Sequence, residues 1–200
     1  MRTPVPYRKS LRRRAPRAAQ IQLAAFAALV AMGAHAGGFI VHDLSTVAAD
    51  ARAALGVGFI RKAEAARLIL SCLECKGEHV VDVQLGRQDD GTEQRVRSGQ
   101  TTMARLEALC RARSPTCTLS ALEVSPAVGW ITTYPLGAGF GSTAVVLRDG
   151  DLLTIRSLAA DEPTAKSNAE KTLKAVAGKV VGKQRAEEPV SGRAPERPAN

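Results

Sequence analysis

The residues with the clearest capacity for chemistry are two cysteines in the tetrapeptide Cys72-Leu73-Glu74-Cys75. In a redox-active pair of this spacing, a helix N-terminus stabilises the first thiolate and lowers its pKa. Here an apolar run typical of a strand ends at Cys72, and the following Lys76-Gly77 is typical of a turn. The acidic Glu74 also disfavours a thiolate. The pattern favours a structural disulfide, and a periplasmic thiol–disulfide oxidoreductase using Cys72 and Cys75 is the alternative.

Two further cysteines, Cys110 and Cys117, bring the total to four. An even number in an oxidising compartment predicts two disulfides, and four cysteines allow three pairings. We favour Cys72–Cys75 with Cys110–Cys117, while the crossed pairings stay open. The gap between Cys110 and Cys117 is too long for the usual zinc spacing, and Lys76 stands where haem attachment requires histidine. The sequence therefore predicts no metal and no cofactor.

Large aromatic side chains occur close together at Trp130, Tyr134 and Phe140. Because such side chains dominate binding energy at interfaces, they are the expected interaction patch, although burial in a core explains Trp130 more simply. Only two histidines, His42 and His79, follow residue 36, so few bases exist for nucleophilic catalysis. A non-enzymatic binding or accessory domain is the favoured interpretation.

The N-terminal region predicts export. An uncharged run from Ala18 to Val41 contains the apolar block Ile21–Met32, and Ala34-His35-Ala36 follows that block. Seven cations precede the run: Arg2, Arg8, Lys9, Arg12, Arg13, Arg14 and Arg17. This is the order of a secretory signal peptide, with cleavage expected after Ala36. An uncleaved membrane anchor over residues 18–41 is the alternative, because about 20 apolar residues can cross a bilayer.

The compartment changes how the net charge is interpreted. Removing the seven cations of residues 1–36 from the net charge of +9 leaves +2. A nearly neutral domain is not an electrostatic trap for phosphates, which argues against a nucleic-acid partner. We expect a periplasmic or secreted protein that binds protein partners in the cell envelope, as a subunit or assembly factor. If the segment stays uncleaved, the chain would be a single-pass structural subunit of the inner membrane with its C-terminal domain outside.

The elements that must position these residues begin with a partly helical lead-in over residues 37–66. Val47, Ala51 and Leu55 are spaced to share one face of a short helix, and further helical turns are expected at Lys62–Ala66. An α+β domain stabilised by disulfides follows over residues 67–182, and residues 183–200 have the composition of a disordered tail.

Strands are predicted mainly from alternation and from turn residues. Val81, Val83 and Leu85 alternate with polar residues, as in a half-buried strand. Asp-Gly pairs at 90–91 and 149–150 predict hairpins, the first with a returning edge strand at Glu93–Arg97. Residues 137–142 have the composition of a glycine-rich connection. The other predicted strands are 68–72, 119–124, 130–136, 144–148 and 152–156.

Two helices complete the expected architecture. Thr101 or Thr102 can cap a helix that ends before Ser114-Pro115. Asp161 caps a longer helix that Gly182 follows. Its apolar stripe consists of Ala165, Ala169, Leu173, Val176 and Val180. We predict an α+β fold with a mainly antiparallel sheet of six to seven short strands, one inserted helix and a C-terminal amphipathic helix packed on one face.

Overall fold

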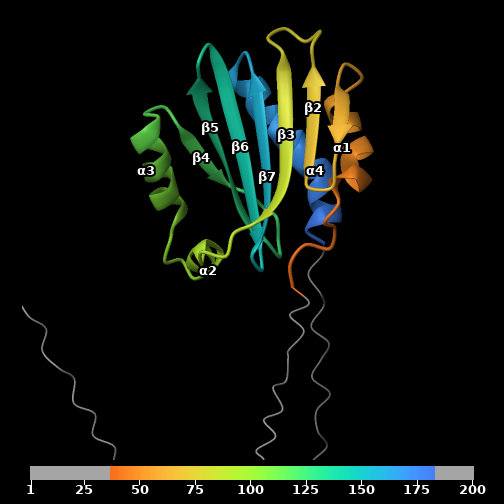
Figure 1. The fold of residues 1–200 in the computed structure, drawn as a ribbon. Coiled ribbons are helices and arrows are strands. Elements are labelled where there is room, and N and C mark those ends of the chain that lie inside the picture. Colours follow the sequence, from red (N-terminus) through yellow and green to blue (C-terminus); the bar gives the residue numbers. More distant parts are fainter. Residues whose placement is uncertain (1–36, 183–200) are drawn as a thin grey trace, which may run out of the picture. The chain divides into compact units, whose positions relative to one another are not determined.

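A seven-stranded antiparallel sheet organises the domain in a computed structural model that describes residues 37–182 (Figure 1). The strand order is β1-β2-β3-β7-β6-β5-β4. The strands are β1 (Ile60–Ala63), β2 (Arg67–Cys72), β3 (His79–Arg87), β4 (Thr118–Ala121), β5 (Val128–Leu136), β6 (Gly139–Arg148) and β7 (Asp151–Ala159). The helices are α1 (Ala48–Leu55, after a 3-10 turn at Leu44–Val47), α2 (Thr92–Arg97), α3 (Met103–Arg113) and α4 (Glu162–Val180). The predicted α+β fold is confirmed, whereas the predicted signal peptide and tail lie outside the described residues.

Helix α4 builds the core together with the middle of the sheet. All five residues of its predicted stripe are buried, and α4 packs on β6 and β7. Its start is also as predicted, because the Asp161 carboxylate accepts a hydrogen bond of 2.8 Å from the Thr164 amide. Helix α1 packs against α4 and buries Ala48 and Ala51 in the same core. The helices therefore cover one face of the sheet, which we call the helix face.

The opposite face, which we call the open face, points toward the viewer in Figure 1. Helix α3 lies beside its β4 edge, and short edge strands, β1 and β4, limit the sheet on both sides. The two ends of the sheet also differ. Gly38 and Gly182 both lie at the end that carries the β6–β7 turn, because the Gly38 amide donates to Asp149 of that turn and the Ile40 amide donates to the Val180 carbonyl at the end of α4. We call this the terminal end, and the opposite end the distal end.

The predicted edge strand at Glu93–Arg97 is wrong, because this segment forms helix α2. The Asp90 carboxylate accepts a hydrogen bond of 2.9 Å from the Thr92 amide, which satisfies a free donor in the first turn. Glu93 and Arg97 form an ion pair at 2.7 Å across one helical turn. The charged composition that suggested an exposed strand therefore stabilises an exposed helix.

The lead-in also differs from expectation. Helix α1 has the predicted buried face, but the helical turns expected at Lys62–Ala66 are wrong, because strand β1 covers Ile60–Ala63. The segment pairs antiparallel with β2, and a tight turn at Glu64 and Arg67 joins them through reciprocal backbone hydrogen bonds. Pairing with the neighbouring strand decides this element, and local sequence periodicity does not report it.

The predicted glycine-rich connection at 137–142 is likewise mostly strand, since β6 begins at Gly139. Only Gly137 and Ala138 connect β5 to β6. A Cβ atom on Gly139 would lie 2.5 Å from the Ala159 carbonyl oxygen, so glycine allows close approach of β7. The predicted hairpin at Asp149-Gly150 is confirmed, with φ angles of 52° and 84° that suit a type I′ turn.

Substitution of two adjacent leucines of β7 tests the assignment of the two faces. Leu153 is fully buried on the helix face, whereas Leu152 is half-buried on the open face. We expect Leu153→Ala to lower the free energy of unfolding by about 2–5 kcal/mol, through lost burial and a residual cavity. Leu152→Ala should cost clearly less. Urea unfolding of both variants measures the difference, and equal losses would contradict a one-sided core.

Acid sensitivity tests the cap of α4. The Thr164 backbone amide lowers the pKa of Asp161 by hydrogen bonding to its ionised form, and the Thr164 hydroxyl adds to the effect. Since the folded-state pKa is depressed, this stabilisation is present above about pH 4 and is lost as the pH falls through the lowered value. Asp161→Asn keeps an acceptor but does not titrate. Thermal melts from pH 6 to pH 2 should show a smaller acid-induced decrease for this variant, and identical profiles would exclude a contribution from Asp161.

Candidate interaction surface

The Cys72–Cys75 pair forms a disulfide at the distal end of β2, with Cα atoms 5.4 Å apart. Cys72 is buried, and the residues after it form a turn that leads into β3. His79 is the partner of Cys72 in the β2–β3 ladder. Since no helix begins at this pair, the feature that lowers a thiolate pKa in redox-active disulfides is missing from its surroundings. These surroundings favour a structural link over a redox-active pair.

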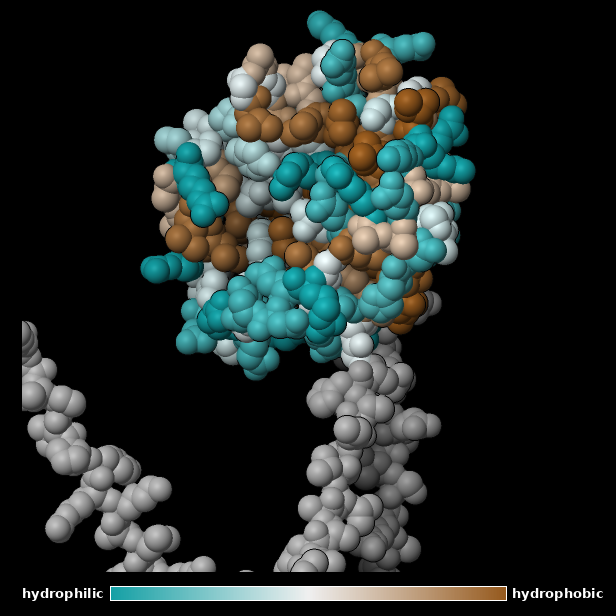
Figure 2. Space-filling model, in the orientation of Figure 1, coloured by the Kyte–Doolittle hydropathy of each residue, from teal (hydrophilic) through white to brown (hydrophobic). Residues whose placement is uncertain are grey.

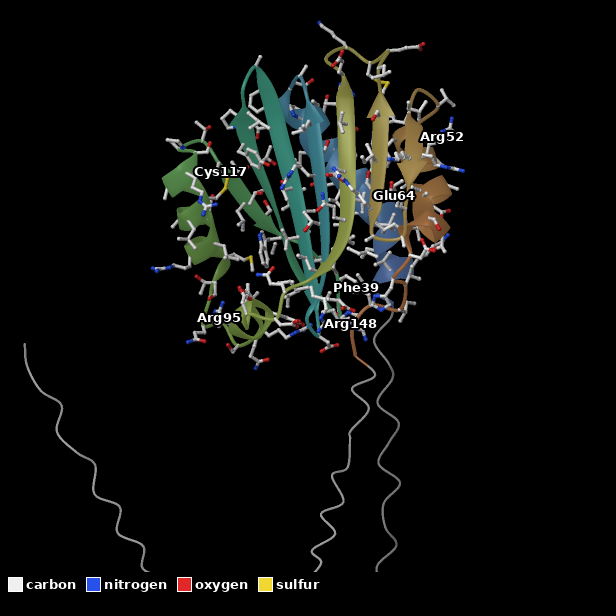
Figure 3. The ribbon with its side chains drawn as sticks, viewed as in Figure 1. Phe39, Arg52, Glu64, Arg95, Cys117 and Arg148 are labelled. Atoms are coloured by element: carbon white, nitrogen blue, oxygen red, sulfur yellow. A yellow bond between two sulfur atoms is a disulfide. The ribbon has the colours of Figure 1, made fainter. Side chains whose placement is uncertain are left out.

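The second disulfide joins Cys110 of α3 to Cys117 before β4, with Cα atoms 5.8 Å apart (Figure 3). The structure thus has the favoured local pairing at both sites. Arg111 adds a hydrogen bond of 3.3 Å from Nε to the Cys117 carbonyl. Closing so short a loop contributes about 2–3 kcal/mol on the chain-entropy model. Helix α3 is therefore held beside the edge of the sheet, although it buries no residue completely.

The structure brings two of the three predicted aromatic residues together and separates the third. Trp130 and Tyr134 both lie on the open face of β5, and both are half-buried. Phe140 is paired with Ala159, which is buried on the helix face, so Phe140 lies on the other side of the sheet. Tyr134 lies opposite Gly141, where a Cβ atom would meet the tyrosine ring at 2.7 Å. Glycine at this position leaves room for the ring to lie across β6.

Tyr134 belongs to a row of cross-strand neighbours at the distal half of the open face. The strand register places one residue from each of six strands in this row: Ile60, Ser71, Val80, Leu158, Gly141 and Tyr134. We call it the distal row. Five strand-to-strand steps of about 4.8 Å make it about 24 Å long. Figure 2 shows hydrophobic side chains across this part of the face, above a more hydrophilic region.

Exposed aliphatic side chains extend the distal row at both ends. Val57 and Leu73 are 94% and 70% exposed beside Ile60, which is itself 62% exposed. Leu136 and Leu109 are about half exposed at the other end, beside Tyr134. Among the described residues, the remaining large hydrophobic residue with comparable exposure is Ile40, which lies at the terminal end. We call the row with these four flanking residues the distal apolar surface.

An open hollow lies at each end of this surface. The larger one, of about 740 Å³, lies between α3 and the end of β5 and is lined by Leu109, Arg113, Tyr134 and Pro135 among others. The smaller one, of about 290 Å³, lies beside the Cys72–Cys75 disulfide and is lined by Val57, Ile60, Ser71 and Leu73 among others. Members of the distal row line both hollows, since Tyr134 lines the larger one and Ile60 and Ser71 line the smaller one.

Polar side chains border the distal apolar surface on the side nearer the terminal end. Arg67 forms a two-pronged ion pair with Asp82, at 2.9 and 3.0 Å, and Gln84 donates to the same carboxylate at 2.8 Å. Hydrogen bonding to Asp82 raises the pKa of Arg67. Arg156 lies opposite Asp82 in the β3–β7 ladder and is exposed. The border therefore presents charges next to apolar side chains, as the rim of a protein interface does.

Sequence reasoning found Tyr134 but missed the aliphatic members of this surface. Val57 and Leu73 occur singly in loops, where an apolar residue is unremarkable. Ile60 lies in the segment whose strand was not predicted. Leu73 inside the cysteine motif was a signal for an exposed apolar residue. A short disulfide loop at the end of a strand has little core around it in which an aliphatic side chain could be buried.

No family model, no curated protein and no solved structure matches this chain. Within residues 37–182, none of the helices combines the length and hydropathy needed to span a bilayer. No cluster of side chains suited to a metal ion occurs in the same part of the chain.

The reactivity of the Cys72–Cys75 disulfide distinguishes a structural role from a redox role. Because Cys72 is buried and no helix N-terminus supports a thiolate, we expect no alkylation of the native protein and resistance to glutathione buffers. Intact mass after alkylation measures the thiol count, with Cys110→Ser/Cys117→Ser as the variant that isolates the pair. A reduction potential above about −300 mV would support the oxidoreductase alternative.

Proposed function

We propose that the chain is an exported, non-enzymatic binding domain that contacts a protein partner in the cell envelope through the distal apolar surface. The export part of this proposal is supported by the order of charged, apolar and small residues in positions 1–36. The binding part is supported by the described domain, and the two parts can be tested separately.

One observation carries the binding part. The exposed large hydrophobic residues Val57, Ile60, Leu73, Leu109 and Leu136 all belong to the distal apolar surface. Single exposed apolar residues are ordinary, but a contiguous apolar surface on a soluble domain marks an interaction site. Tyr134 adds an aromatic ring beside a hollow, which is the type of residue that anchors an interface.

The position of this surface relative to the chain ends also supports the proposal. The described chain enters and leaves the domain at the terminal end, where the Ile40 amide bonds to Val180. The distal apolar surface lies at the other end of the strands. The points where the chain continues beyond Gly37 and Gly182 are therefore away from the proposed interface. This holds whether the N-terminal segment is removed or kept.

The composition of the surface favours a protein partner over other classes. Apolar side chains bordered by Arg67, Asp82 and Arg156 match the apolar core and charged rim of protein interfaces. A nucleic-acid partner would require a concentration of cations, whereas here the Arg67 cation is paired with Asp82. The membrane is expected to matter only through an uncleaved segment 18–41.

Two isoleucines of similar exposure provide a matched test. Ile60 is 62% exposed in the distal apolar surface, and Ile40 is 66% exposed at the terminal end. A photoreactive amino acid at position 73 should crosslink in living cells to a discrete envelope protein. Ile60→Asp should reduce the yield of this crosslink at least about tenfold, since a charge in an apolar interface costs well over 1.4 kcal/mol.

Ile40→Asp is the control and should leave the crosslink unchanged. Equal effects of the two substitutions, or no crosslink at position 73, would refute the binding part. Fractionation and intact mass of the same cells test the export part. A periplasmic or secreted chain that begins at Gly37 supports cleavage, whereas intact chain in the membrane fraction supports the anchored alternative.

A further inference from the structure

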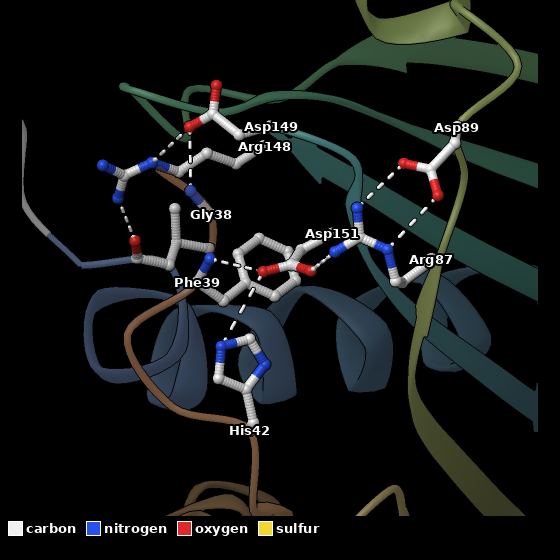
Figure 4. Close-up of polar contacts among 9 residues, drawn as sticks. Gly38, Phe39, His42, Arg87, Asp89, Arg148, Asp149 and Asp151 are labelled. Carbon is white, nitrogen blue, oxygen red and sulfur yellow. Dashed lines mark hydrogen bonds and ion pairs between the residues drawn. The ribbon is translucent and has the colours of Figure 1, made fainter. Parts of the chain in front are cut away.

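Two carboxylates of the β6–β7 hairpin, Asp149 in its turn and Asp151 at the start of β7, hold the backbone of Gly38 and Phe39 (Figure 4). The Gly38 amide donates a hydrogen bond of 2.9 Å to Asp149, and the Phe39 amide donates one of 2.8 Å to Asp151. Consecutive amides of a strand usually point in opposite directions, but Gly38 adopts a φ of 97°, which turns the chain between the two carboxylates. The start of the described chain is thus bound at a defined place.

The approach at Gly37 is unusually close. A Cβ atom added to Gly37 would lie 2.6 Å from the Asp149 carboxylate oxygen, and one added to Gly38 would lie 2.5 Å from Asp151. Since Cβ and the amide nitrogen of one residue are about 2.5 Å apart, the Gly37 nitrogen lies within about 5 Å of that Asp149 oxygen. A rotation about the flexible backbone of Gly37 can close the remaining distance to an ion pair.

We infer that Asp149 is the binding site for the α-ammonium group that cleavage after Ala36 creates on Gly37. The inference rests on the cleavage in the proposed function, because only a free N-terminus carries this charge. Cleavage replaces the neutral peptide nitrogen of Gly37 with a cation next to a carboxylate that already binds the following amide. The sequence evidence and the geometry are independent. The sequence predicts a new N-terminus at Gly37, and the geometry brings the Gly37 nitrogen within about 5 Å of an Asp149 carboxylate oxygen.

The surrounding charges leave Asp149 free to accept this group. Asp151 is only 9% exposed and is already engaged by Phe39 and by Arg87 at 3.0 Å, and His42 lies 3.8 Å from it. Asp149 is 55% exposed. Its neighbour Arg148 lies 3.6 Å away through Nε, but Arg148 also donates to the Val181 carbonyl. The Gly38 amide and Arg148 Nε both contact Asp149 Oδ2, which is also the oxygen nearest Gly37. Within residues 37–182 no hydrogen bond or ion pair engages Asp149 Oδ1, so this oxygen is free for the α-ammonium group.

The expected consequence is that cleavage after Ala36 stabilises the domain. The ammonium pKa should rise above its ordinary value of about 7.7–8.0, because Asp149 favours the charged form. A group whose pKa is raised on folding stabilises the folded state at low pH, and this stabilisation is lost as the pH rises through the raised value. The N-terminal contribution should therefore be present at pH 6 and absent at pH 10.

The test uses residues 37–200, which comprise the compact unit Ala36–Asn200 without its first residue. A cleavable N-terminal fusion releases this chain with Gly37 as its first residue, and half of the sample is then acetylated at its α-amine. At pH 6 the free chain should melt about 2 °C above the acetylated chain, a shift expected for one partly exposed ion pair. The difference should vanish at pH 10.

Asp149→Asn is the decisive variant, because asparagine keeps an acceptor and tolerates the positive φ of 52° at this position. It should abolish the difference between free and acetylated chains, whereas Asp161→Asn at the distal end should preserve it. No difference at pH 6, or an equal difference in Asp149→Asn, would overturn the inference. If cleavage fails in cells, the intact mass will not match a chain that begins at Gly37. That result would refute the proposed processing, but it would not change the melting temperatures measured on the purified chain.

Discussion

Burial of the apolar stripe of α4 against β6 and β7 is the interaction on which the rest of the structure depends. Val176 and Val180 are fully buried on this face, as are Leu153 and Ile155 of the strand beneath. Full burial of such side chains is worth about 1.5–3 kcal/mol each, which makes this layer the main source of stability. Helix α1, Phe39 and Phe59 belong to the same core, so residues 37–66 are structurally continuous with the domain that follows.

A sheet covered on one face only leaves the other face to be explained. On β2, β3 and β7 it carries charged side chains beside the distal row, with Arg67 and Asp82 paired across two strands. Closer to the terminal end it also carries Trp130, Leu152 and the fully buried Leu147. Its distal part is apolar from Ile60 to Tyr134, and loops at that end expose further aliphatic side chains. This division gives the domain a polar region that water can solvate and a distal region suited to a partner, which is the basis of the proposed function.

The terminal end of the sheet binds the backbone at residues 38–39 and at Val181. The β6–β7 hairpin presents Asp149 and Asp151 to the incoming chain, and Arg148 between the strand and the turn reaches the Val181 carbonyl after α4 (Figure 4). One hairpin therefore fastens both ends of the described chain. Because backbone groups are bound by charged side chains here, the path of residues 37–39 is set by hydrogen bonds that a free N-terminus can extend.

The sequence by itself determined the features that local chemistry controls. The cap at Asp161, the stripe of α4 and the Asp149-Gly150 turn were predicted because each depends on a few adjacent residues. Residues 93–97 are a different case, because the helix there begins with a local contact of Asp90, and the charged segment was wrongly predicted as a strand. Only the tertiary structure decided the features that depend on pairing with another element. Ile60–Ala63 became a strand by pairing with β2, and Phe140 was separated from Tyr134 by the register of β5, β6 and β7. The distal apolar surface belongs to this second group, since the exposure of an aliphatic side chain is set by what the folded chain leaves uncovered.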